Sequence, residues 1–283
     1  MHPSFERLNE YNVNNSNKIL YLSLPLAALI IIASISGLST EGFYSTETLN
    51  WQAQSLGQDA IDLFVITPAL IITAIFITRK NKTAFFVWSG INIYLIYTFV
   101  IYCFDLHFNS LFIVYCLILG LSFYSVLYFL FSQIHKQVEK EIFNKTVVKI
   151  IAVYLLIISV LFYFLWLSEI IPAIIHHQTP KSLVETGLLT NPIQVIDLSV
   201  ILPGLFLIFI FLMQKRPVGL LLLPGALVFC ILMDITIGWL IIAMKIKGLE
   251  VDYLIAVIMG ILAVLNIVLL IWYFRKMKYS HAW

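Results

Sequence analysis

The chain has 283 residues, of which 61% are hydrophobic and only 11% charged. Because a water-soluble domain carries about 25% charged residues, this composition indicates an integral membrane protein, and membrane lipids are its expected surroundings. The formal net charge is only +2, and no dense basic tract is present that could neutralise a run of phosphates, so nucleic acid is not an expected partner.

Eight stretches supply the roughly 20 mainly apolar residues that a helix needs to cross the hydrocarbon layer. Runs such as residues 26–33 are continuously apolar, whereas strands of a transmembrane barrel alternate in character. The sequence therefore predicts an all-α polytopic membrane protein with eight transmembrane helices. The expected spans are approximately residues 18–37, 60–79, 83–104, 108–132, 148–171, 195–214, 217–243 and 252–274.

The distribution of Lys and Arg predicts the orientation, because short cytoplasmic loops carry the excess of basic residues. With the N-terminus in the cytoplasm, 14 of the 17 basic residues lie inside, and 11 of the 15 acidic residues lie outside or at outer helix ends. We therefore expect a bacterial inner (cytoplasmic) membrane protein with both termini in the cytoplasm. The expected parts are a cytoplasmic N-terminal segment (1–17), a first four-helix repeat (18–133), a cytoplasmic linker (134–147), a second four-helix repeat (148–276) and a cytoplasmic tail (277–283).

An internal repeat is the clearest feature of the sequence. The nine residues 62–70 and 197–205 are identical at six positions, including the Asp and the Pro. Extended without gaps, the alignment pairs Gly90 with Gly225 in the following span. Each unit holds four spans, so both copies enter the membrane in the same direction. We expect two parallel four-helix repeats related by an axis along the membrane normal.

The repeat places Asp62 and Asp197 near the outer ends of their spans, about one turn before Pro68 and Pro203. A proline loosens the preceding helical turn, and a carboxylate within a membrane is a site hypothesis by default. The two Asp side chains are either caps that fix the outer loops, or a cation or proton site, or catalytic groups. All three interpretations stay open.

Other polar residues extend the set of ligand-binding candidates. Span three carries Tyr94 and Tyr97 on one polar stripe that should face the bundle interior or a pocket. Asp234 is the deepest acid, and its repeat equivalent is Phe99, so a site that uses it would belong to one half only, as a substrate pocket does. The full set of ligand-binding candidates is Asp62, Asp197, Asp234, Tyr94, Tyr97, Asp105, Asn109, Glu41 and Glu169.

The outer segments 42–58 and 173–194 mix apolar and polar residues and are expected to form short interfacial helices or a lid. The three cysteines fall within apolar spans and are expected to pack rather than to form disulfides or metal sites. No glycine-rich phosphate loop and no His-Glu-x-x-His motif occurs. The sequence therefore assigns neither a catalytic residue, nor a metal, nor a cofactor.

The string that begins Tyr-Leu-Ile-Tyr-Thr at Tyr94 and the string Asp-Leu-Ser-Val-Ile-Leu-Pro at Asp197 resemble a bacterial integral-membrane family without an assigned activity. The resemblance implies a bacterial origin and no mechanism. The leading hypothesis is a transporter or channel-like protein for a cation or a proton-coupled small molecule. The alternatives are an intramembrane enzyme acting on an outer-leaflet lipid or isoprenoid, and a non-catalytic sensor or assembly partner.

Overall fold

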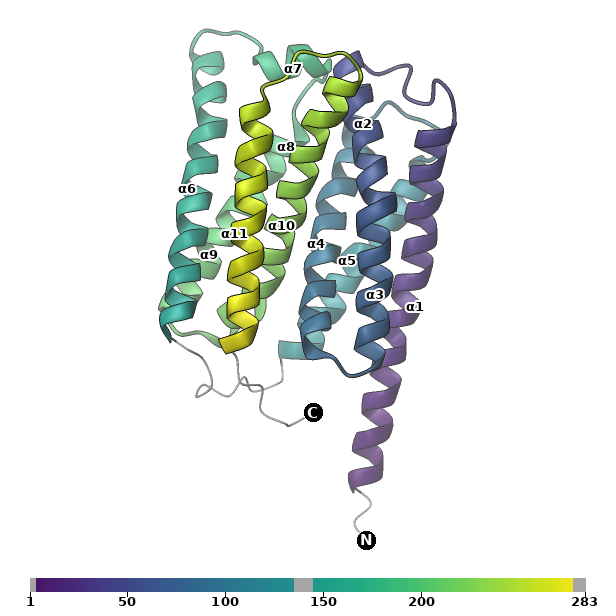
Figure 1. The fold of residues 1–283 in the computed structure, drawn as a ribbon, viewed down its shortest axis with the longest axis vertical. Helices are drawn as coiled ribbons and strands as arrows, with labels where there is room; N and C mark the ends of the chain where they lie inside the picture. The colour runs from purple at the N-terminus through teal and green to yellow at the C-terminus, as the bar shows by residue number, and fades with distance from the viewer. Residues whose placement is uncertain (1–3, 135–144, 277–283) are drawn as a thin grey trace.

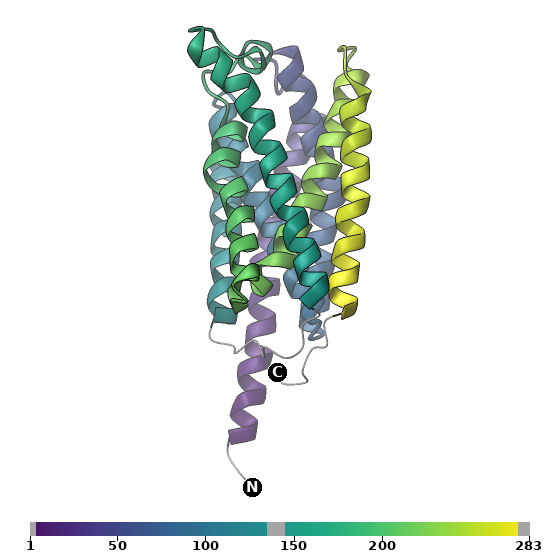
Figure 2. The ribbon, with the colours of Figure 1, turned by 90° about the vertical axis from the view of Figure 1, so that its left-hand side faces the viewer.

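The computed structural model describes residues 4–134 and 145–276, with side chains from residue 17 onward, so the predicted linker and tail lie almost wholly outside it. Its described part holds eight helices long and apolar enough to cross a membrane (Figures 1 and 2), which confirms the all-α polytopic class. The spans are α1 (Ser4–Ser39), α2–η1–α3 (Leu49–Ile61, Asp62–Ile66 and Thr67–Thr78), α4 (Lys82–Asp105), α5 (Phe112–Ile134), α6 (Lys145–Ile175), α8–η2–α9 (Pro192–Ile196, Asp197–Ile201 and Leu202–Met213), α10 (Pro217–Ile246) and α11 (Tyr253–Lys276).

One expectation for the outer segments is wrong. Residues 49–58 form neither a separate interfacial helix nor a lid, because the second span is a continuous helix that starts at Leu49 after the N-cap Thr48. Alternate polar and apolar residues made this segment look like a loop, but Trp51, Ser55 and Asp59 are buried in the bundle. The segment 173–194 does contain a short separate helix, α7 (Lys181–Thr186), which lies beside the start of α2 (Figure 1), where the Thr48 hydroxyl donates to the Thr186 carbonyl at 3.2 Å.

Both repeated Asp residues begin a π-helical turn. The η1 and η2 turns start at Asp62 and Asp197, and each ends directly before the helix that carries the proline. In each case the backbone N–H that follows the turn bonds to the Asp carbonyl five residues earlier. Since Pro203 has no N–H to continue this pattern to Leu198, the Leu198 carbonyl instead accepts a hydrogen bond from the Tyr163 hydroxyl of α6 at 3.2 Å.

The two halves make corresponding helix contacts, as Figure 1 shows for the sets α1–α5 and α6–α11. In the first half α1 packs on α3 and α5, and α4 packs on α3 and α5. In the second half α6 packs on α9 and α11, and α10 packs on α9 and α11. Helix α10 joins the halves by packing on both α4 and α2. These contacts are compatible with two four-helix repeats, and both the repeat and its axis along the membrane normal stay predictions.

The contact between α4 and α10 depends on two glycines that the repeat alignment pairs. A Cβ atom on Gly90 would lie 2.7 Å from the carbonyl oxygen of Gly225 and 2.5 Å from the Cβ of Val228. Small residues allow helix backbones to approach closely in membranes, where packing rather than the hydrophobic effect drives association. The two paired positions therefore meet at the junction of the halves.

We expect Gly90→Ala to destabilise the protein by roughly 1–3 kcal/mol, because the added methyl group overpacks a contact with backbone atoms. The measurement is the thermal unfolding midpoint in detergent. The matched control is Gly120→Ala, since nothing lies within 4 Å of a Cβ there, and better helix propensity should leave that variant as stable as the wild type or more so. Equal midpoints for the two variants would contradict the close approach.

Candidate functional site

A cavity of about 260 Å³ lies within the second half of the bundle, where α6, η2, α9, α10 and α11 face α2 and α4 of the first half. Its walls are mainly apolar and aromatic. A small number of polar side chains is set among them, as in a typical small-molecule site. The polar residues on which the argument rests are Gln58, Tyr97, Asp197, Asp234, Thr236 and Asn266.

Asp197 reaches the cavity because of the local sequence before it. Asn191 caps α8 by accepting hydrogen bonds from the N–H groups of Ile193 and Gln194 at 3.0 and 3.3 Å, and Pro192 occupies the first helical turn. The short helix then passes into η2 at Asp197. One carboxylate oxygen accepts a hydrogen bond from Nε1 of Trp166 at 2.9 Å, while Tyr97 of α4 lies beside the carboxylate.

Asp234 lies on α10 and is 7% exposed. Its Oδ2 accepts a hydrogen bond from Nδ2 of Asn266 on α11 at 2.8 Å. The Oδ1 of Asn266 and the hydroxyl of Tyr154 are buried at the cavity, where Tyr154 lies beside Asn266, and neither atom makes a hydrogen bond of 3.5 Å or less with another described residue. Buried polar atoms are nearly always hydrogen-bonded. These two atoms therefore provide polar valences for a ligand or for water.

Asp62 lies outside the cavity wall but is connected to it by a hydrogen-bonded chain. Gln58 donates from Nε2 both to Oδ1 of Asp62 at 3.0 Å and to the Tyr94 hydroxyl at 2.8 Å. The Tyr94 and Thr236 hydroxyls are 2.8 Å apart, and Thr236 lines the cavity. The Oδ2 of Asp62 is buried without a partner among the described residues. The first half thus contributes an acid, Asp62, that is connected to the cavity by side-chain hydrogen bonds.

A second buried acid, Asp59, was missing from the sequence prediction. Tyr44 and Tyr102 donate to its two carboxylate oxygens at 2.7 and 2.8 Å, and only a glycine fits at position 37, where a Cβ would lie 1.9 Å from Oδ2 of Asp59. Burial, followed by the negative charge of Asp59, raises the pKa of Tyr44 well above its usual range, so this hydroxyl keeps its proton and acts as a donor. The available signal was the spacing of three residues to Asp62, which puts both acids on one helix face.

The structure separates the other candidates from the cavity. Glu169 accepts hydrogen bonds from the Ser182 amide at 2.9 Å and from Nε2 of Gln194 at 3.0 Å, so it ties α6 to α7 and α8. Asp105 is buried at the outer end of α4, Asn109 caps the turn that follows it, and Glu41 is exposed. Of the predicted set, Tyr97, Asp197 and Asp234 line the cavity, and Asp62 and Tyr94 join it through the chain of hydrogen bonds.

The described side chains contain no group of three or more His, Cys, Asp or Glu residues that could hold a metal ion. Within the same part of the chain, neither Lys nor Arg forms an ion pair with Asp59, Asp62, Asp197 or Asp234. Comparison with protein-family profiles, curated proteins and solved structures gives no match to this chain. The function is therefore argued from the site, and the resemblance to a bacterial membrane family stays a prediction.

We expect Tyr102→Phe to lower the free energy of unfolding by about 1–3 kcal/mol, because the buried Asp59 carboxylate would lose one of its two phenol donors. Denaturation of the purified protein in detergent measures this loss. The control is Tyr124→Phe. Tyr124 is 65% exposed, so this substitution should change the free energy of unfolding little. A loss in the control as large as in Tyr102→Phe would show that the Asp59 hydrogen bond is not the cause.

Proposed function

We propose that the protein is a membrane transporter and that the cavity of the second half binds its substrate, a cation or a small molecule that moves together with protons. The observation that carries this proposal is the placement of Asp197 and Asp234 on the wall of one cavity. Asp197 has the neutral donors Trp166 and Tyr97, and Asp234 has the neutral donor Asn266. A neutral donor satisfies part of a carboxylate's hydrogen-bonding capacity but does not neutralise its negative charge.

The lining favours a cation with an apolar body. Aromatic side chains of Tyr97, Phe162, Trp166 and Phe229 form much of the wall, and aromatic faces attract organic cations. A bare metal ion would prefer a compact shell of oxygen ligands instead. The cavity volume of about 260 Å³ suits a molecule smaller than a phospholipid.

The chain from Asp62 through Gln58 and Tyr94 to Thr236 supports coupling to protons. The Gln58 carboxamide donates to both Asp62 and Tyr94, so it carries no proton between them. Protonation of Asp62 instead weakens the bond from Gln58, and this change reaches the cavity through Tyr94 and Thr236. Asp62 also sits at the start of a π-helical turn, a feature that occurs often at functional sites. In this proposal the first half supplies the proton-exchanging acid and the second half supplies the binding cavity.

The test is uptake into liposomes that contain the purified full-length protein. The substrates are Na⁺, K⁺ and a graded series of quaternary ammonium ions, with a pH-sensitive dye inside the vesicles. We expect Asp197→Asn and Asp234→Asn to lower uptake of the organic cations roughly tenfold to 100-fold, the loss of one charge-assisted contact of about 1.5–3 kcal/mol. Asp62→Asn should uncouple proton movement while cation binding remains.

The matched control is Asp252→Asn, an exposed outer-loop residue whose side chain accepts a hydrogen bond from the Leu254 amide. Asn can accept the same bond, so uptake should equal that of the wild type. Transport unaffected in both cavity variants would contradict the proposal. Product formation from an outer-leaflet lipid extract, abolished in Asp197→Asn and Asp234→Asn but not in the control, would support the enzyme alternative in its place.

A further inference from the structure

A second, larger cavity lies at the opposite end of the second half from α7. It measures about 590 Å³ and opens between the start of α6 and the hairpin that joins α9 to α10. Four cationic side chains line it, those of Lys145, Lys149, Lys215 and Arg216, and the lining contains no acidic residue among the described parts of the chain. This end of the bundle is also where α1 begins and α11 ends (Figure 1).

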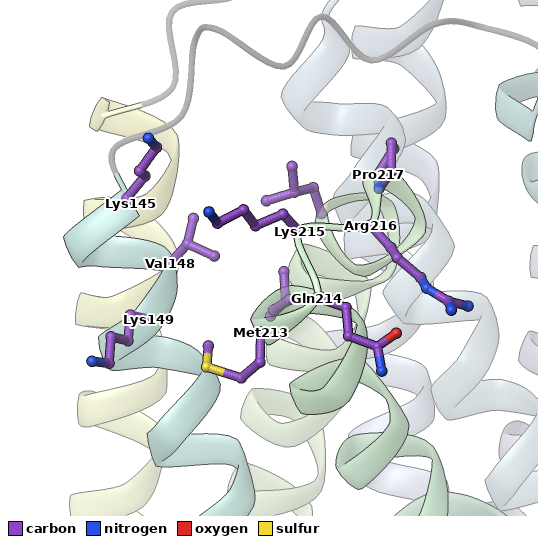
Figure 3. A pocket seen from close by; sticks show the side chains of 10 residues that line it. Lys145, Val148, Lys149, Met213, Gln214, Lys215, Arg216 and Pro217 are labelled. Atoms are coloured by element: carbon purple, nitrogen blue, oxygen red, sulfur yellow. The ribbon is translucent and has the colours of Figure 1, made fainter.

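The hairpin presents its charge by means of an unusual backbone conformation. Lys215 has a φ of 57°, in the left-handed region that favours glycine. This conformation closes the turn, in which the amides of Lys215 and Arg216 bond to the carbonyls of Leu212 and Phe211 at 3.0 and 2.8 Å. Figure 3 shows the Lys215 side chain extending from this turn toward Val148 and Lys145 of α6. A cation therefore occupies a position where glycine would be less strained.

Apolar side chains line the cavity together with the cations. They are those of Val148, Leu212, Met213 and Leu220, and the Arg216 guanidinium lies 5.6 Å from the centre of the Phe211 ring. Cations beside apolar side chains at the end of a transmembrane bundle match the two parts of an anionic phospholipid, its phosphate and its acyl chains. Basic pockets between transmembrane helices bind such headgroups.

We propose that this cavity is a binding site for an anionic phospholipid of the leaflet that meets this end of the bundle. The phosphate lies among Lys145, Lys149 and Lys215, and the first part of an acyl chain contacts Val148 and Leu220. The site is separate from the cavity with Asp197 and Asp234, and it is independent of whether that cavity binds a transported cation. Its role is to fix the α9–α10 hairpin against α6.

The experiment places the full-length protein in phosphatidylcholine nanodiscs with 0–30% phosphatidylglycerol. Native mass spectrometry counts retained lipids, and thermal unfolding measures stabilisation. We expect phosphatidylglycerol to be retained and to raise the unfolding midpoint of the wild type. The double variant Lys149→Gln/Lys215→Gln should bind it roughly 20-fold more weakly, since each basic residue near an anionic surface contributes about fivefold, and high salt should weaken binding in the wild type.

The matched control is Lys245→Gln/Lys247→Gln, which removes two lysines at the other end of the bundle and should leave retention unchanged. A second arm adds inorganic phosphate or glycerol 3-phosphate to phosphatidylcholine nanodiscs. If these soluble phosphates stabilise the wild type as much as phosphatidylglycerol does, the ligand is a soluble phosphate and the lipid proposal is overturned. Equal retention of phosphatidylglycerol by both double variants would overturn it as well.

Discussion

The arrangement of buried side chains in this protein depends on the energetic cost of a carboxylate in an apolar helix bundle. Charge in a membrane must be neutralised, paired or surrounded by donors, and the described part of the chain offers buried acids neutral donors rather than Lys or Arg. Each acid therefore recruits a particular partner: phenols for Asp59, an indole for Asp197 and carboxamides for Asp62 and Asp234. Tyr102, Trp166 and Asn266 lie on other helices than the acids they bind, so these three acids help to determine which helices meet. Gln58 lies on the same span as Asp62, and Tyr44 lies in the turn that follows α1.

The span count could be predicted because length and apolarity are properties of the sequence itself. The α4–α10 junction could not, because an alignment that pairs Gly90 with Gly225 does not say that the two glycines meet. The start of the second span at Leu49 could not be predicted either. Residues 49–59 mix polar and apolar side chains, and this pattern fits both an exposed loop and a helix whose side with Trp51, Ser55 and Asp59 faces the bundle interior. The cavity also escaped prediction, because it depends on how far α6 and α11 stand apart. Asp234 and Asp197 were identified as acids, but only packing shows that they share one space.

The halves use one plan for different purposes. Where the first half has Asp59 bound by two tyrosines, the aligned position of the second half is Gln194 of α8, which donates to Glu169 near the end of α6. Where the second half has Asp234, the first has Phe99, which packs against Tyr102 and Tyr115. The first half is thereby filled with aromatic rings at the depth where the second half is hollow. The two halves therefore differ at these aligned positions: the second half contributes polar groups to a cavity, and the first half contributes packed aromatic rings.

The π-helical turns at Asp62 and Asp197 also bear on how such a scaffold changes over evolutionary time. A π turn accommodates one residue more than an α turn, so each marks a place where a single codon can be gained or lost without interrupting the helix. Loss of that residue would turn the whole outer part of the span by about 100° relative to the rest. In the second span this rotation would carry Asp59 away from Tyr44 and Tyr102. One small deletion would thus replace the buried Asp59 by a different side chain of the same helix.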